Sequence, residues 1–214
     1  MKKNKRALAK VFALAALAWS SAVHADIISG SGTGAVFAKL FPANAPPPIF
    51  QVGNDNWNVN GVFWGFDERT LTLGAPLSAF SSVGGAAAAL AAGTRVQSHY
   101  IFYDPVGGSF SGTVQFDRPI LGVIWDTAGL AGSDPLFGLP SVTYNSVPAT
   151  GLELGADIFS FSGSTLSVSW GAANPGDSIR VLTAAVPEPS SYAMMLAGLG
   201  AFGALTYRRR SRVS

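Results

Sequence analysis

The sequence predicts an all-β fold: a two-layer antiparallel β-sandwich, with a terminal hydrophobic helix at each end of the precursor. Short runs that alternate apolar and polar residues recur between residues 26 and 186, separated by Gly, Pro and Asp turn signals. Many short strands with little helical patterning are typical of a sandwich. No long internal repeat is evident, which argues against a propeller or a β-helix. We favour a jelly roll and keep an immunoglobulin-like Greek key as the alternative.

Residues 1–25 have the three parts of a secretory signal peptide. The first ten residues are rich in Lys and Arg, Val11–Trp19 is a short apolar core, and Val23-His24-Ala25 fits the positions that signal peptidase reads. The core has no polar face, which argues against an amphipathic helix. We therefore expect cleavage between Ala25 and Asp26 and an exported domain over residues 26–186.

The first half of the exported domain contains one strong strand signal. Residues 26–48 are rich in Gly, Ser, Ala and Pro and predict a loose entry segment that could hold one edge strand. Trp57–Phe66 predicts a strand whose apolar parity changes at Gly61, which indicates a bulge there. Thr70–Leu73 predicts a short strand, and the alanine-rich residues 84–93 predict either one or two helical turns or a compact loop.

The middle of the domain continues the alternation. Thr94–Tyr103 places apolar residues on one strand face and a more polar set on the other: Arg95, Gln97, His99 and Tyr103. Phe110–Phe116 alternates again, and Ile120–Trp125 is nearly continuous in apolar residues, as in a strand buried on both faces. We expect residues 126–140 to be loop and Val142–Tyr144 to be a short strand.

Asp157–Trp170 gives the clearest local signal, a β-hairpin around the two-residue turn Gly163-Ser164. Counting outward from the turn pairs one phenylalanine with Leu166 and the other with Val168. The apolar side chains then share one face and the hydroxyl side chains the other: Phe159, Phe161, Leu166, Val168 and Trp170 against Ser160, Ser162, Thr165 and Ser167. Ser178–Thr183 predicts the last strand.

The exported domain differs in charge from the whole chain. The chain has 14 Lys and Arg and 12 Asp and Glu, for a net charge of +2. Nine of the basic residues but one acidic residue lie in the terminal segments, so the domain itself carries about −6. A basic footprint for nucleic acid is therefore absent. The chain has no cysteine, so the fold must rest on packing alone or on an ion.

One polar stretch is a candidate ligand site. Asn54, Asp55, Asn56 and Trp57 place oxygen-bearing side chains close together, which suits Ca²⁺. The alternative is an ordinary Asn/Asp turn before a strand. The tryptophans of the domain could stack on sugar rings, but buried core aromatics are the commoner case.

We predict no catalytic residue, no metal residue and no cofactor other than this possible Ca²⁺. His99 is the sole histidine of the exported domain, and we expect a surface or hydrogen-bonded structural role for it. No Gly-x-Ser-x-Gly elbow accompanies it. The aspartates lie mostly in turn contexts, where Asp supplies its own hydrogen bond. Asp67-Glu68-Arg69 could be an acidic site or a solvated turn with an internal ion pair, and we favour the turn.

The last 28 residues predict a targeting segment that is not part of the folded domain. Pro187, Glu188 and Pro189 hold the backbone extended. A helix over about residues 192–207 spans roughly 24 Å, a little short of a bilayer core of about 30 Å. The arginine cluster beyond it favours a cytoplasmic C-terminus and acts as a membrane stop: Arg208, Arg209, Arg210 and Arg212.

Residues 187–214 closely resemble the PEP-CTERM sorting signal of Gram-negative bacteria, because the Pro-Glu-Pro element, the short apolar helix and the Arg-rich end follow in that order. The resemblance implies recognition by a membrane-embedded exosortase, cleavage near Pro-Glu-Pro and delivery to the cell exterior. Family members commonly occur in bacteria that make extracellular polysaccharide. The central pattern, from Ser98-His99-Tyr100 to Phe116–Ile124, is similar to an uncharacterised domain of other PEP-CTERM proteins.

Two functions remain open from the residues. The first, which we favour, is a non-enzymatic exported protein of the cell surface or exterior, associated with polysaccharide or biofilm matrix. The second is a secreted hydrolase of unrecognised type acting on polysaccharide. The expected partners are signal peptidase, exosortase, the membrane at least transiently and, for either function, polysaccharide; nucleic acid is not among them. The mature form either stays anchored in the membrane or is released after processing.

Overall fold

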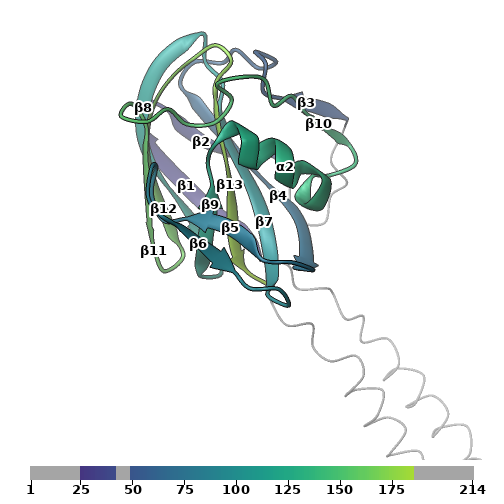
Figure 1. Cartoon of the computed structure of the whole chain (residues 1–214). Helices are drawn as coiled ribbons and strands as arrows, with labels where there is room; N and C mark the ends of the chain where they lie inside the picture. Colours follow the sequence, from purple (N-terminus) through teal and green to yellow (C-terminus); the bar gives the residue numbers. More distant parts are fainter. Residues whose placement is uncertain (1–24, 42–48, 186–214) are drawn as a thin grey trace, which may run out of the picture. The chain divides into compact units, whose positions relative to one another are not determined.

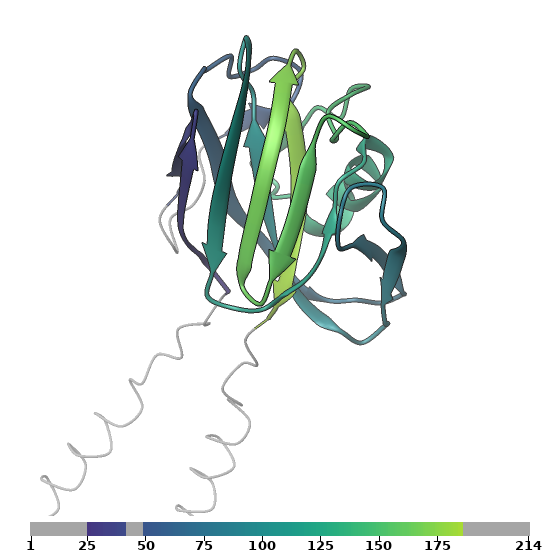
Figure 2. The ribbon, with the colours of Figure 1, turned by 90° about the vertical axis from the view of Figure 1, so that its left-hand side faces the viewer.

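The computed structural model describes residues 25–41 and 49–185, and within them two β-sheets lie face to face. The smaller sheet has four antiparallel strands and occupies the front of Figure 2. In spatial order its strands are β1 (Ile27–Thr33), β8 (Gly107–Phe116), β12 (Thr165–Ala173) and β11 (Ile158–Ser162).

The larger sheet has seven strands, with β13 at its centre. In spatial order they are β2 (Val36–Lys39), β4 (Val62–Thr72), β7 (Arg95–Tyr103), β13 (Asp177–Ala184), β9 (Ile120–Ile124), β5 (Leu77–Phe80) and β6 (Ala87–Leu90). The neighbours β2 and β4 run parallel and the other pairs run antiparallel. The prediction of a purely antiparallel arrangement is therefore wrong at this edge.

The main core fills the space between the two sheets. The smaller sheet contributes large side chains from β8 and β12, among them Phe110 and Trp170, and the larger sheet contributes Phe63, Ile101 and Val181. Burial of alternate residues along each strand gives this layer its hydrophobic stabilisation. The mostly β architecture is confirmed. The choice between jelly roll and immunoglobulin topology stays a prediction.

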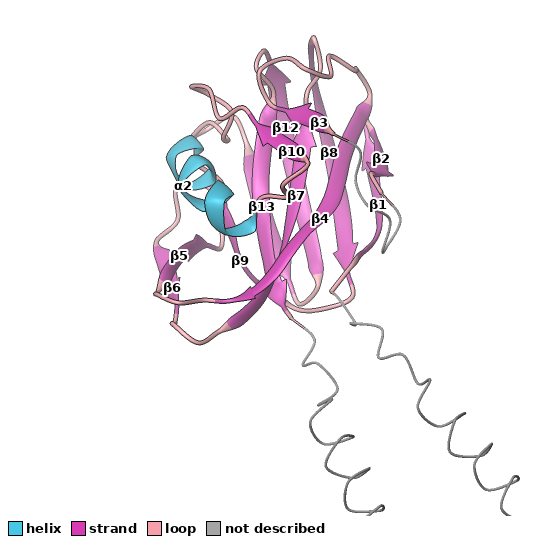
Figure 3. Cartoon of the chain, turned by 90° about the vertical axis from the view of Figure 1, so that its right-hand side faces the viewer, coloured by secondary structure: helices cyan, strands magenta, loops and turns pink. Residues whose placement is uncertain are grey.

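A third layer covers the other face of the larger sheet. It consists of helix α2 (Thr127–Phe137) and the short parallel pair β3 (Phe50–Val52) and β10 (Val142–Tyr144), as Figures 1 and 3 show. A second apolar cluster lies beneath it. The central strands β7 and β13 of the larger sheet are thus buried on both faces, which a two-layer prediction did not include.

Helix α2 is the main departure from the predicted loop at residues 126–140. It begins after Asp126, whose side chain accepts a hydrogen bond from the backbone N–H of Gly129 at 2.8 Å and so caps the helix. Two glycines and Pro135 weaken the local helical signal. Leu130 and Phe137 are buried against the sheet. This tertiary packing stabilises a helix whose own sequence has a low helix propensity.

Two further segments differ from their predictions. Ala87–Leu90 forms strand β6 and pairs antiparallel with β5, so residues 84–93 are neither a helix nor only a compact loop. Strand β4 begins at Val62 and extends to Thr72, joining two predicted strands, and its register shift lies between Asp67 and Thr70. Gly61 has φ of 75° in the turn before the strand, a backbone conformation that favours glycine.

The predicted hairpin and its register are confirmed. Strands β11 and β12 pair Phe159 with Val168 and Phe161 with Leu166, around a turn in which Gly163 has φ of 58°. Phe159 is fully buried and Ser160 is exposed.

The described segment enters and leaves the sandwich at the same end. The backbone N–H of Asp117 bonds to the carbonyl of Asp26, and that of Ala184 bonds to the carbonyl of Pro119, so the start of β1 and the end of β13 both lie beside the turn after β8. Strand β13 has eight residues and spans about 25 Å. Its first residue, Asp177, therefore lies at the opposite end.

Candidate functional site

Three polar groupings of the domain have the residue types that sites use, and His99 belongs to the first. The face of β7 that carries His99 points into the core between the two sheets. The imidazole ring of His99 is fully buried and packs against Phe116. Its Nδ1 lies 2.7 Å from Oδ1 of Asp67 and its Nε2 lies 2.9 Å from Oγ1 of Thr183. The expectation of a solvated turn at Asp67 is wrong, since Asp67 also pairs with Lys39 at 2.7 Å.

This Asp–His–Thr line has the order of a catalytic triad but not its access. Burial alone would raise the pKa of the Asp67 carboxyl, yet the hydrogen bonds and charges of His99 and Lys39 hold that pKa below its usual value. The hydroxyl of Thr183 is fully buried. A substrate cannot contact it in this conformation, so the three side chains act as a buried clamp that joins β4, β7 and β13.

The second grouping is centred on Arg180, which β13 directs toward α2. Its guanidinium is fully buried and forms a bidentate pair with Glu68, with Nε–Oε2 of 2.7 Å and Nη2–Oε1 of 2.9 Å. The other N–H groups bond to α2: to the carbonyl of Leu130 at 3.2 Å, to Oγ of Ser133, and to Oδ1 of Asp134 at 2.9 Å. These contacts hold α2 against the sheet. Burial alone would lower the pKa of Arg180, but the neighbouring carboxylates raise it.

The predicted ligand stretch forms a tight turn at the end of the sandwich where β13 begins. Asn54 and Asp55 both have positive φ, which Asn and Asp tolerate better than most residues. The N–H of Trp57 donates to Oδ2 of Asp104 at 3.0 Å. Oδ1 of Asp55 and Oδ1 of Asp104 are buried without a hydrogen-bond partner. A ligand role for Asn54, Asp55, Asn56 and Trp57 stays a prediction.

Trp57, Trp64 and Trp125 lie half-buried within aromatic clusters, and Trp170 is buried in the main core. Trp57 packs against Trp64 with ring centroids 4.8 Å apart and against Phe102 at 5.4 Å, and Trp125 packs against Phe80 at 5.8 Å. This packing favours the core role over a sugar platform.

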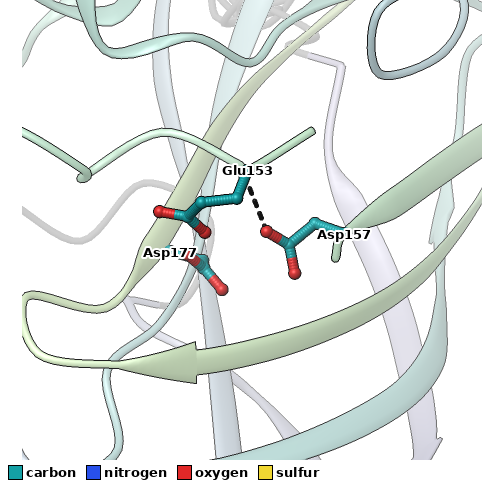
Figure 4. A group of neighbouring side chains, drawn as sticks. All are labelled: Glu153, Asp157 and Asp177. Atoms are coloured by element: carbon teal, nitrogen blue, oxygen red, sulfur yellow. Dashed lines mark hydrogen bonds between the residues drawn. The ribbon is translucent and has the colours of Figure 1, made fainter. Parts of the chain in front are cut away.

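The third grouping is a cluster of three carboxylates, Glu153, Asp157 and Asp177, shown in Figure 4. Glu153 lies in the connection between β10 and β11, Asp157 directly precedes β11, and Asp177 begins β13. Each contributes an oxygen, and these oxygens lie within 4.8 Å of one another. We refer to this group as the carboxylate cluster.

Backbone N–H groups hold Asp157 in place, whereas one carboxylate oxygen of Asp177 has no hydrogen-bond partner. Oδ2 of Asp157 accepts from the N–H of Glu153 at 2.7 Å, and its Oδ1 accepts from the N–H of Gly171 at 2.9 Å. Asp177 is 2 % exposed, and its Oδ2 has no hydrogen-bond partner. Burial and the charges of Asp157 and Glu153 raise the pKa of Asp177 to about 8.

Such close carboxylates bind a cation more readily than they cleave a sugar. A retaining glycosidase also holds two carboxyl groups close together, at about 5 Å. Those groups must contact the substrate, whereas Asp157 and Asp177 are each 2 % exposed. An oxygen-only group of ligands with an exposed Glu153 at its edge instead has the composition of a hard-cation site.

Sequence reasoning missed this cluster because its members are far apart in the chain and each looked like turn chemistry. One signal was available. A hairpin followed by another strand returns the chain to the same end, so Asp157 before β11 and Asp177 at the start of β13 must share an end of the sandwich.

Comparison with known families identifies the C-terminal segment and not the β domain. Residues 185–210 match the model of the PEP-CTERM protein-sorting motif. The chain therefore carries the C-terminal sorting signal of exported proteins that exosortase targets. No curated protein and no solved structure matches the chain. The similarity of the central pattern to other PEP-CTERM domains stays a prediction.

The predicted membrane helix at about residues 192–207, the Pro-Glu-Pro element and the arginine cluster lie outside the described residues, as do residues 1–24 of the signal peptide. Within residues 25–41 and 49–185, no helix is long and apolar enough to cross a membrane.

Proposed function

We propose that this chain is a non-enzymatic exported protein, cut by signal peptidase and exosortase, whose β domain associates with extracellular polysaccharide at or beyond the cell surface. The observation that carries the proposal is the match of residues 185–210 to the sorting motif. The predicted net charge of about −6 for residues 26–186 suits an exported domain that does not bind nucleic acid.

The structure at Asp26 supports cleavage after Ala25. The backbone N–H of Asp26 donates to Oδ1 of Asp117 at 2.8 Å. Cleavage would turn this N–H into a charged α-amino group beside the same carboxylate, which strengthens the bond. The new N-terminus would thus be held in place rather than repelled.

The outer face of the smaller sheet supports a role in polysaccharide binding. Strands β1, β8, β11 and β12 contain no charged residue. Serine and threonine hydroxyls cover the outer face and bond across strands, as between Ser31 and Thr113 at 3.2 Å and between Ser111 and Ser169 at 2.9 Å. A shallow hollow of about 440 Å³ lies among them. This hydroxyl face offers donors and acceptors to sugar hydroxyl groups without charge selection.

The alternative of a secreted hydrolase has less support. Two of the three residues of the carboxylate cluster, Asp157 and Asp177, are buried, and the hollow on the hydroxyl face is lined by no acidic residue. A glycosidase requires two carboxyl groups that reach the same glycosidic bond.

The processing prediction concerns both ends of the exported protein. Its intact mass, measured from a host that has exosortase, is expected to show an N-terminus at Asp26 and the loss of Arg208–Arg212. Glu188→Ala should leave an uncut, membrane-bound form, because the Pro-Glu-Pro element is then incomplete. Ser191→Ala, outside the tripeptide, should be cut normally. Normal processing of the Glu188 variant would contradict the assignment.

The binding prediction concerns the hydroxyl face. Ser167→Glu puts a charge in the middle of this face, and we expect the exported protein to lose most of its retardation in native gels that contain polysaccharide from the producing cells. Ser78→Glu, an exposed serine of β5 in the other sheet, is the matched control and should leave retardation unchanged. Equal retardation of both variants would rule out the hydroxyl face as the binding surface.

A further inference from the structure

We propose that Glu153, Asp157 and Asp177 bind one Ca²⁺ ion, which ties the connection before β11 to the start of β13 and so links the two sheets at this end of the sandwich. Strand β11 belongs to the smaller sheet and β13 to the larger one. An ion at this position would join the smaller sheet directly to the larger one.

The spacing of the oxygens fits a single ion. Ca²⁺ binds oxygen at about 2.3–2.6 Å, so two ligands on opposite sides of the ion are about 5 Å apart. The three carboxylate oxygens lie within 4.8 Å of one another, which allows all of them to share one coordination sphere.

One of the ligands, Asp157, is held in place before an ion arrives. The two backbone N–H bonds to Asp157 fix its carboxylate, and each of its oxygens keeps a second lone pair for a cation. A site that needs no rearrangement binds with less entropic cost.

Asp177 gives an independent indication of a missing ligand. Its Oδ2 is buried and has no partner, although Figure 4 shows its carboxylate directed at the other two. A buried polar oxygen without a partner is costly, and buried charges are normally paired or bound to a metal. A cation between the three carboxylates would satisfy this oxygen.

No basic side chain of the described ion pairs neutralises the cluster. Those pairs lie elsewhere: Lys39 with Asp67, Arg118 with Asp117, and Arg180 with Glu68 and Asp134. A divalent ion supplies the opposite charge that the chain itself places at other positions.

Calcium fits this site better than magnesium. Ca²⁺ accepts six to eight oxygens in irregular arrangements, whereas Mg²⁺ demands near-ideal octahedral geometry at about 2.0–2.1 Å. Glu153 is exposed, so water can complete the shell on that side. A chain without cysteine that leaves the cytoplasm can gain from an ion the cross-link that a disulfide would otherwise give.

The test is the melting temperature of the exported protein in EDTA and in 10 mM CaCl₂. Extracellular Ca²⁺ sites typically have a Kd of about 0.1–1 mM, so 10 mM CaCl₂ is about 10–100 times Kd. At this concentration the bound ion should raise Tm by about 3–10 °C. Asp177→Asn keeps the shape of the side chain and replaces one carboxylate ligand by an amide that stays neutral. It should fold at least as well as the unchanged protein in EDTA and gain little from Ca²⁺.

The matched control is Asp55→Asn, which neutralises a carboxylate with an unpartnered oxygen in the turn at residues 53–58, at the same end of the sandwich. It should keep the full Ca²⁺ response. Calorimetric titration should give one Ca²⁺ per chain, lost in Asp177→Asn. No rise in Tm, an undiminished rise in Asp177→Asn, a response abolished by Asp55→Asn instead, or an equal response to Mg²⁺ would each overturn the proposal. None of these results depends on the processing or polysaccharide assays.

Discussion

Arg180→Met is expected to lower the free energy of unfolding by about 3–5 kcal/mol, a large part of the about 5–15 kcal/mol that stabilises a single domain. The substitution removes the cation but leaves the Glu68 carboxylate in place. That side chain is fully buried and would keep the hydrogen bond from Oγ of Ser98 at 2.6 Å. A buried carboxylate without its counter-charge carries a large desolvation cost.

The loss extends to the third layer, because Arg180 joins α2 to the sheet. Its guanidinium also lies over the rings of Tyr100 and Tyr144, at 5.3 and 5.4 Å from their centroids. Methionine retains part of this apolar packing but none of the bonds to Leu130, Ser133 and Asp134. Equilibrium unfolding in urea of the exported protein measures the effect.

The double variant Arg180→Met, Glu68→Met separates an unpaired charge from simple loss of contacts. When both partners of a buried ion pair become apolar, stability is often recovered. We expect the double variant to be more stable than Arg180→Met alone. If the two variants were equally unstable, the cost would lie in the packing around α2 and not in the uncompensated carboxylate.

The hairpin could be predicted from sequence because its information is local. Alternation with a period of two fixes which side chains share a face, and Gly163 permits the positive φ that the turn requires. Strands β7 and β13 were located from the same pattern. The polar residues of β7, however, looked like a solvent-exposed face.

The buried polar side chains could not be predicted, because their partners are distant in the chain. Arg180 and Glu68 are 112 residues apart, and His99 and Thr183 are 84 apart. A polar residue in a strand predicts a solvent-exposed position unless a buried partner for its side chain is known. Helix α2 escaped prediction for the same reason, since its stability comes from contacts made after folding.

The carboxylate cluster shows why a site built from distant residues could not be predicted from the sequence. Asp157 and Asp177 each satisfy the local rule for a turn, and Glu153 lies in a connection without a regular pattern. Only the return of the hairpin to one end of the sandwich brings them together. The sorting signal, in contrast, is contiguous, and its three parts could be recognised without any fold.

Phe159→Ala is expected to lower the free energy of unfolding by about 3–5 kcal/mol, as for other phenylalanines removed from a core. Phe159 is fully buried in the main core between the two sheets and faces Val168 across β11 and β12. Truncation leaves a cavity that the neighbouring strands cannot close without losing their register. Urea unfolding of the exported protein measures the change.

The neighbouring residues provide the controls for this prediction. Ser160 is exposed, so Ser160→Ala should change stability by no more than about 0.5 kcal/mol. Phe161 is only partly buried at the edge of the core, and Phe161→Ala should fall between the two. This order tests the register, because a slip of one residue would exchange the two faces and make Ser160 the sensitive position. Equal effects at Phe159 and Ser160 would mean that β11 does not pack its phenylalanines into the sandwich.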